Sequence, residues 1–327
     1  MSSQQHRTQR APASSPPAQA AQESPVTQVS NSLMQQQISQ LQAGGSSQGP
    51  KVEITTDLLS MLGGGQDQAV DPSLDHEDRG SISYQEHEGQ TFVQGGNDRR
   101  PISPNDVDQN GLGDCYLLAA MAAIARANPR AIRRLIRDNG DGTYDVTLYL
   151  HENFWDFTRS SHVETVSSSF PTNAEGKPEY AGFGDQGPGG PELWVMLIEK
   201  AFAQYEGGYE DIVGGNPGEA MEMLMVGEHT TWDTDDYSPE RLGELIHQAM
   251  ADGDPVTAST RKIAGMSASK KEEAEDVGIV GGHAYAIRGV NVGAQTISLQ
   301  NPWGNSHIVG LSLSDFQTYF YRAQVLR

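Results

Sequence analysis

From about residue 100 onward, helical patterns come first and strand patterns follow, and this order constrains the fold more than any other feature. Apolar residues at helical spacing predict helices over 115–137, 191–205 and 238–251. The first helix should break at Asn128-Pro129, because proline removes an amide donor and clashes with the turn before it. Alternation and turn signals predict strands at 141–150, 255–260, 283–290, 296–301 and 322–327, with a short helix at 313–320. Helices followed by strands predict an α+β fold with two subdomains.

Two of these helices carry start signals. Ser238 followed by Pro239 has the pattern of an N-cap and a first helical residue. Pro191 likewise predicts the first turn of the helix over 191–205. The helix over 238–251 is therefore expected to begin at Pro239, and Pro191 is expected in the first turn of the other helix.

The first 95 residues have a different composition. Residues 1–50 are rich in Gln, Ser, Ala and Pro, which bury too little apolar surface to offset the entropy of ordering. We predict a disordered tail over residues 1–95 and a folded domain over 96–327. Within the tail, residues 30–42 could form a short helix, and 51–62 could dock as an amphipathic helix.

Charge and cysteine count exclude several classes of protein. The net charge of −21 disfavours binding to nucleic acid, which requires clustered Lys and Arg. A single cysteine can form neither an internal disulfide nor a thiolate metal cage. No apolar run approaches the roughly 20 residues of a membrane span, and the N-terminus lacks the apolar core of a secretory signal. We therefore expect no membrane span, and either a cytoplasmic protein or one exported without a leader.

The single cysteine, Cys115, lies in the stretch "QNGLGDCYLLAA" at 109–120. An arbitrary lone cysteine is more often a small buried apolar residue. Here Gly111 and Gly113 precede it and leave room for a substrate backbone. Asp114 can cap the helix, which would place the thiol in the first turn, where the helix dipole favours a thiolate. These are the surroundings of a nucleophilic thiol.

A nucleophilic thiol needs a base and a group that orients the base. His283 follows two glycines in "GGHAYAI", and Asn301 ends the next predicted strand in "LQNPWG". Alone, the first could be a hydrogen-bonded core histidine and the second a turn residue. Neighbouring strands lie about 4.8 Å apart, close enough for Asn301 to hold the far ring nitrogen of His283. The order Cys, His, Asn is typical of papain-like proteases.

Four blocks of the chain together resemble the protease core of calpains, papain-like intracellular cysteine proteases. They are "QNGLGDCYLLAA", "ELWVMLIEKAFAQYEGGYEDIVGGNPGEAMEML", "GGHAYAI" and "LQNPWG", in family order over roughly residues 100–327. Tyr116 replaces the usual Trp after the cysteine, and Gln300 replaces the usual Arg before the asparagine. The resemblance implies a papain-like core of two subdomains, a helical Cys half and a β-rich His/Asn half. A stand-alone core of this kind looks more bacterial than animal.

The resemblance implies a role for each matching residue. Cys115 would be the nucleophile, His283 the general base and later acid, and Asn301 the group that orients His283. Gln109 falls where the family places an oxyanion-hole amide, although alone it would be a loop residue facing solvent. Trp303 would pack over the His–Asn pair and exclude water, or serve as an ordinary core aromatic. The implied function is a calpain-like cysteine endopeptidase that cleaves protein or peptide substrates. Flexible exposed tails are preferred cleavage sites, so we also expect an active enzyme to trim its own N-terminal tail; the alternative is that the tail is an export or localisation signal.

Calcium is a further implication of the resemblance. Asp106 and Glu192 fall where the Cys half of the family carries acidic calcium ligands, and carboxylate oxygens suit Ca²⁺. In a chain this acidic, each could equally be a solvated surface acid. The segment after "NPWG" contains no acid before Asp315, so a second site is not expected. We predict at most one Ca²⁺, bound in the Cys half, and no other cofactor.

Two other functions remain open on the sequence. Transglutaminases share the papain-like layout, but their third group is Asp, which Asn301 disfavours. A calpain-like core can also lose activity and persist as a binding module. The complete set of Gln109, Cys115, His283 and Asn301 argues against such loss.

Overall fold

The computed structural model describes residues 69, 71–74, 82–95, 100–153 and 156–327. All of them belong to one compact unit, Gln66–Arg327. The helices predicted at 30–42 and 51–62 lie outside the described residues. None of the helices in the described part of the chain has the length and apolar character that a bilayer crossing needs.

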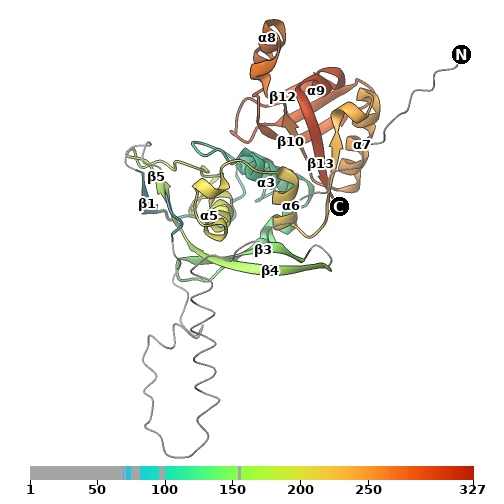
Figure 1. Ribbon diagram of the computed structural model, residues 1–327. Helices are drawn as coiled ribbons and strands as arrows, with labels where there is room; N and C mark the ends of the chain where they lie inside the picture. Colours follow the sequence, from blue (N-terminus) through green and yellow to red (C-terminus); the bar gives the residue numbers. More distant parts are fainter. Residues whose placement is uncertain (1–68, 70, 75–81, 96–99, 154–155) are drawn as a thin grey trace, which may run out of the picture. The chain divides into compact units, whose positions relative to one another are not determined.

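Helices and an antiparallel sheet form the Cys half of the fold (Figure 1). Its helices are α3 (Cys115–Ala127), α4 (Pro129–Leu135), α5 (Trp194–Glu206) and α6 (Pro217–Leu224), with the 3-10 turns η1 (Pro104–Asp106) and η2 (Glu210–Ile212). Its three-stranded sheet has the order β2-β3-β4, from β2 (Ile136–Asp138), β3 (Thr143–Asn153) and β4 (Asp156–Ser167). Two short pairs complete it: β1 (Ser83–Glu86) with β5 (Ser169–Thr172), and β6 (Gln186–Gly187) with β7 (Gly190–Pro191).

A six-stranded antiparallel sheet dominates the His/Asn half. Its order is β12-β11-β10-β9-β13-β8, from β8 (His229–Asp233), β9 (Val256–Thr260), β10 (Ala284–Asn291), β11 (Thr296–Gln300), β12 (Ile308–Ser312) and β13 (Phe320–Leu326). The helices of this half are α7 (Pro239–Asp252), α8 (Ala268–Asp276) and α9 (Leu313–Tyr319), with η3 (Thr234–Asp236) and η4 (Ile263–Gly265). Figure 1 shows α7 and α9 packed along the strands β10 and β13.

Two apolar cores meet along β10. Ala284 and Ala286 belong to the core around α3, whereas Tyr285 and Ile287 belong to the core under α7 and α9. This alternation is that of a strand buried on both faces. Small alanines on the α3 side let the helix approach the strand closely, which brings the residue before β10 near the start of α3. The α+β fold with a helical Cys half and a β-rich His/Asn half is confirmed.

The buried helix α3 is the centre of the Cys half. Its residues from Tyr116 to Ala125 are all buried, which is expected of a helix that is apolar on every side. The predicted break is confirmed, since α3 ends at Ala127 and α4 begins at Pro129. The predicted helical segment was too long, because residues 136–138 pair with β3 as a strand.

One predicted helix start is confirmed and one is wrong. The Ser238 side chain accepts a hydrogen bond from the Arg241 amide, and Pro239 is the first residue of α7. Pro191, by contrast, lies in the strand β7 and pairs with Gln186, and α5 begins three residues later at Trp194. Proline has no amide to donate, so it is tolerated in a short edge pair as well as in a first helical turn.

Residues within the predicted tail pack on the catalytic domain. Strand β1 pairs with β5, and Val93 is buried. Further upstream, the Asp71 carboxylate lies 2.5 Å from the ammonium nitrogen of Lys200, whose side chain is fully buried. The Ser73 carbonyl accepts from the Tyr209 amide at 3.2 Å. In the described residues, contacts with the catalytic domain therefore begin at Asp71, upstream of the predicted boundary at residues 95/96.

Candidate active site

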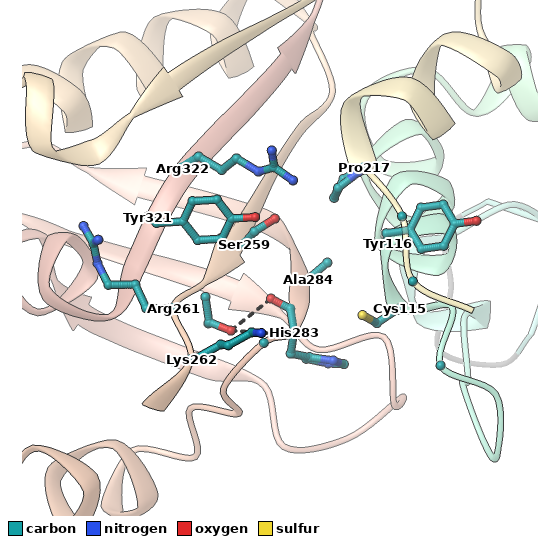
Figure 2. A pocket seen from close by; sticks show the side chains of 15 residues that line it. Cys115, Tyr116, Pro217, Ser259, Arg261, Lys262, His283, Ala284, Tyr321 and Arg322 are labelled. Carbon is teal, nitrogen blue, oxygen red and sulfur yellow. Dashed lines mark hydrogen bonds between the residues drawn. The ribbon is translucent and has the colours of Figure 1, made fainter. Parts of the chain in front are cut away.

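The thiol and the imidazole are presented from the two halves of the fold. Cys115 is the first residue of α3, and His283 directly precedes β10. Figure 2 shows them on opposite walls of one cavity, with Cys115 on the helical side. The cavity has a volume of about 450 Å³ and is lined by both residues and by Gly113.

His283 and Asn301 meet as the strand order requires. Strands β10 and β11 are antiparallel neighbours, so the start of one lies beside the end of the other. The Oδ1 of Asn301 lies 3.0 Å from Nε2 of His283. An amide oxygen can only accept, so Nε2 carries the proton and Nδ1 keeps a free lone pair. Asn301 thereby selects the tautomer in which Nδ1 can take a proton from a thiol.

Several groups fix the histidine in place. The Thr260 hydroxyl accepts from the His283 amide at 2.8 Å and donates to the His283 carbonyl at 3.1 Å. The Trp303 ring lies 4.9 Å from the imidazole, centre to centre, and the Tyr285 ring meets it edge-on at 5.0 Å. Trp303 therefore packs where it was predicted. Tyr285 and Thr260 were not predicted, although Tyr285 stands in the quoted stretch "GGHAYAI".

Burial sets the resting charges of the thiol and the imidazole. It raises the pKa of Cys115, and the nearby Ala284 amide only partly opposes this effect. Burial also lowers the pKa of His283, against a smaller opposing effect of the bond to Asn301. Both shifts favour the neutral forms. The expectation that the helix N-terminus would favour a thiolate is therefore outweighed by desolvation.

Asp114 does not cap α3 with its side chain, contrary to the prediction. It occupies the N-cap position, but its carboxyl group is fully buried and accepts a hydrogen bond from Nε2 of Gln109 at 3.2 Å. Burial raises the pKa of Asp114 to about 7. The buried carboxyl group thus holds the loop before the cysteine rather than the helix N-terminus.

Gln109 joins the two halves through its backbone. Its amide donates to the carbonyl of Pro302, next to Asn301, at 2.8 Å. Its side-chain NH₂ donates to the Leu112 carbonyl at 2.7 Å and to Asp114. Both side-chain hydrogens are therefore engaged, and a role in an oxyanion hole requires one of these bonds to be exchanged. The Cys115 amide is among the first N–H groups of α3, which have no acceptor within the helix.

Tyr116 and Gln300, the two residues that differ from the usual family pattern, both make structural contacts. The Tyr116 ring lies against Gly215, where an added β-carbon would come within 2.5 Å of it. Gln300 is buried, and its side chain donates to the Pro104 carbonyl across the two halves at 3.1 Å. Neither residue takes the place of a proposed catalytic group.

Asp106 and Glu192, the predicted calcium ligands, are buried close to one another. Asp106 accepts from the Ser103 amide at 2.7 Å, and Glu192 accepts from the Val93 amide at 2.7 Å. The other carboxylate oxygen of Glu192 is buried and has no hydrogen-bond partner among the described residues. Burial, followed by the charge of Asp106, raises the pKa of Glu192 to about 9. Two such carboxyl groups favour a shared proton or a bound cation.

A larger acidic ligand set is not present in the described part of the chain. No group of three or more His, Cys, Asp or Glu side chains there could hold a metal ion. Asp185, which was not predicted, adds a third charge near Glu192. The carboxyl groups that the structure places near Glu192 are thus those of Asp106 and Asp185.

Comparison with known proteins agrees with this geometry. Residues 88–319 match the calpain family cysteine protease profile. The chain belongs to the calpain family of cysteine proteases. It is 32% identical to calpain-9 of Rattus norvegicus over 224 residues, 66% of this chain and 30% of that protein. It is 29% identical to the calpain-2 catalytic subunit of Gallus gallus over 225 residues, 67% of this chain and 30% of that protein. The chain thus spans about 30% of the length of these relatives.

Proposed function

We propose that this calpain-family chain is an endopeptidase that cleaves peptide bonds through a thioester on Cys115. The observation that carries the proposal is the 3.0 Å bond between Asn301 and His283, which leaves Nδ1 free in the cavity shared with Cys115. Nδ1 takes the thiol proton as Sγ attacks the substrate carbonyl, and later gives it to the leaving amine. Water then hydrolyses the thioester. The Cys115 amide and, after rotation, the side chain of Gln109 would stabilise the oxyanion.

The test is cleavage of an unfolded protein substrate by the full chain, with and without prior alkylation of the thiol. We expect cleavage that alkylation abolishes. Adding a labelled primary amine separates the transglutaminase-like alternative, which would transfer the acyl group to that amine. A chain that binds the substrate without cleaving it, with or without calcium, would instead be a binding module.

The neutral resting forms of Cys115 and His283 predict the pH dependence of cleavage. Neutral His283 is the proton acceptor, so kcat/KM should fall only as the pH drops through the His283 pKa, which burial places below 6.5. Protonated Cys115 supplies the proton for the leaving amine, so the alkaline limb should lie above 9.0. We expect a plateau between these limbs in a pH–rate profile. Asn301→Ala removes a bond that raises the His283 pKa, so its acid limb should move to lower pH.

An alkaline limb well below pH 9.0 would contradict this account. It would show that the thiol and the imidazole exchange their proton in the resting enzyme and titrate as a coupled pair.

We propose that Asp106 and Glu192 hold one Ca²⁺, whose charge would offset their mutual repulsion. Calorimetry of the full chain with calcium should give a weak binding signal that Glu192→Gln abolishes. Glutamine preserves an acceptor for the Val93 amide and removes only the charge, which makes it a matched variant. Cleavage should be higher in millimolar calcium than in excess chelator. Binding that persists in both Glu192→Gln and Asp106→Asn would place the ion elsewhere.

Self-cleavage, if it removes the tail, should stop before Asp71. The Lys200 side chain is fully buried, and trimming the chain further would remove its carboxylate partner and leave it only the oxygens of Ser167 and Ser169. Loss of the charged partner of a buried ammonium group is destabilising. We therefore propose that self-cleavage falls within the first 70 residues. Intact-mass spectrometry over time should show the wild-type chain shorten to a limit at or before Asp71. Cys115→Ala should keep its full mass, and trimming of that variant would point to a contaminating protease.

A further inference from the structure

The cavity at Cys115 is basic in a strongly acidic protein. Among the fifteen described residues that line it are Arg261, Lys262 and Arg322, and none is Asp or Glu. The whole chain carries a net charge of −21. A concave site lined by one sign of charge concentrates ligands of the opposite sign. The catalytic mechanism uses none of these three cations.

Arg261 already has a partner. Its guanidinium lies 2.6 Å from the Asp235 carboxylate and 3.2 Å from the Thr234 hydroxyl. Its charge is therefore largely balanced within the protein. Lys262 is exposed and forms no ion pair within the described residues. The charge available to a ligand therefore comes from Lys262 and Arg322.

Arg322 has an unused donor inside the cavity wall. It lies on β13 opposite Ser259 of β9, and Figure 2 shows its guanidinium extending toward Pro217 on the other wall. Its Nε is buried and has no hydrogen-bond partner among the described residues. The guanidinium lies 4.8 Å from the centre of the Tyr321 ring. This cation–π contact positions the guanidinium but gives its N–H groups no hydrogen-bond acceptor.

The other neighbour of Arg322 does not neutralise it. Asp233 of β8 is its register partner and lies on the same face of the sheet. Asp233 is exposed, however, and no ion pair joins the two side chains in the described structure. A buried hydrogen-bond donor without an acceptor destabilises the protein. A ligand that supplies the acceptor therefore gains the full free energy of that hydrogen bond.

We propose that Arg322, supported by Lys262, binds an acidic side chain of the substrate close to the scissile bond. This rests on the proposed function and adds the substrate class, namely peptides with Glu or Asp at this position. A carboxylate matches the forked geometry of a guanidinium. Tyr116, Pro217 and Tyr321 supply apolar walls for the methylene groups of a glutamate.

The test compares peptides that differ only in Glu, Gln or Lys, placed in turn at each position flanking one scissile bond. Glu and Gln have the same shape, so their ratio of kcat/KM isolates the charge. We expect the full chain to favour Glu over Gln by about tenfold at one position, because hydrogen bonds between charged groups have this strength. Arg322→Gln should bring the ratio close to one, and Arg322→Glu should favour Lys.

Two further variants control the experiment. Arg241→Gln removes a cation on α7 that is paired with Glu244, is half exposed and does not line the cavity, so it should keep the tenfold preference. Lys262→Gln should reduce the preference and is available if the Arg322 variants fail to fold.

The outcomes separate this inference from the proposed function. Cleavage without a charge preference, or a preference that survives both Arg322→Gln and Lys262→Gln, would overturn the proposed subsite. Either result would leave the endopeptidase proposal standing. If no peptide is cleaved, the endopeptidase proposal fails. The subsite is then judged by the affinity of labelled Glu and Gln peptides for the Cys115→Ala chain. Equal affinities would overturn it, and tighter binding of Glu would support it.

Discussion

Replacing Cys115 with alanine is expected to reduce cleavage by at least about 10⁴-fold, because loss of a catalytic nucleophile removes the covalent pathway. Cys115 is the only cysteine of the chain, so no second thiol can substitute for it. The change deletes one sulfur atom at the partly buried start of α3 and leaves the buried residues of the helix in place. Initial rates on a fluorogenic peptide should be compared with thermal melts of the same preparations.

An unchanged melting temperature would assign the loss to chemistry. Residual cleavage of more than a few per cent in a folded variant would mean that Cys115 is not the nucleophile.

Replacing His283 with alanine should reduce kcat by at least about 10³-fold, because it removes both the base and the acid of the mechanism. Asn301→Ala should cost only about 10- to 100-fold. Without Asn301, the imidazole still lies between Trp303 and Tyr285, and its backbone remains bonded to Thr260. The Asn301→Ala variant therefore orients the imidazole less firmly but keeps it as the base. Single-turnover rates of both variants provide the comparison.

Asn301→Asp is the matched variant for this comparison, since it keeps an acceptor for the Nε2 proton. It should be more active than Asn301→Ala. A loss in Asn301→Ala that equals or exceeds the loss in His283→Ala, with both variants folded, would contradict the roles assigned to these residues.

The sequence predicted those features that depend on local signals. Pro129 separates α3 from α4, and Ser238 caps α7, because both effects act within one helical turn. The contact between His283 and Asn301 was also predictable. Two consecutive strands joined by a short turn are antiparallel neighbours, so a residue before one and a residue after the other must meet.

Features that depend on distant partners were missed. Strand β4 is rich in Ser, Thr and charged residues, and it exists because β3 pairs with it along its length. Strand β12 was missed as well, and it pairs with β11 at the edge of the large sheet. Asp114 had the sequence signature of a cap, but the fold buries its carboxyl group against that of Glu199. The sequence could not show this, because Glu199 lies on α5, far along the chain from Asp114.

The basic wall of the cavity illustrates the same limit. Arg322 and Lys262 are sixty residues apart in the chain and stand in no motif. They converge because β13 lies next to β9 in the sheet, although three strands (β10, β11, β12) and two helices (α8, α9) come between them in the chain. This neighbouring of β9 and β13 brings Arg322 of β13 and Lys262, two residues after the end of β9, into the cavity that holds the thiol.

The central claim is that Cys115 forms a thioester with the substrate, and one measurement tests it most directly. A peptide ester should acylate the thiol faster than water removes the acyl group, so the intermediate should accumulate. We expect mass spectrometry of the acid-quenched full chain to show one added acyl group, mapped by digestion to Cys115 and absent from Cys115→Ala. Turnover of the ester with no acyl group on Cys115, or with the acyl group on another residue, would contradict the account.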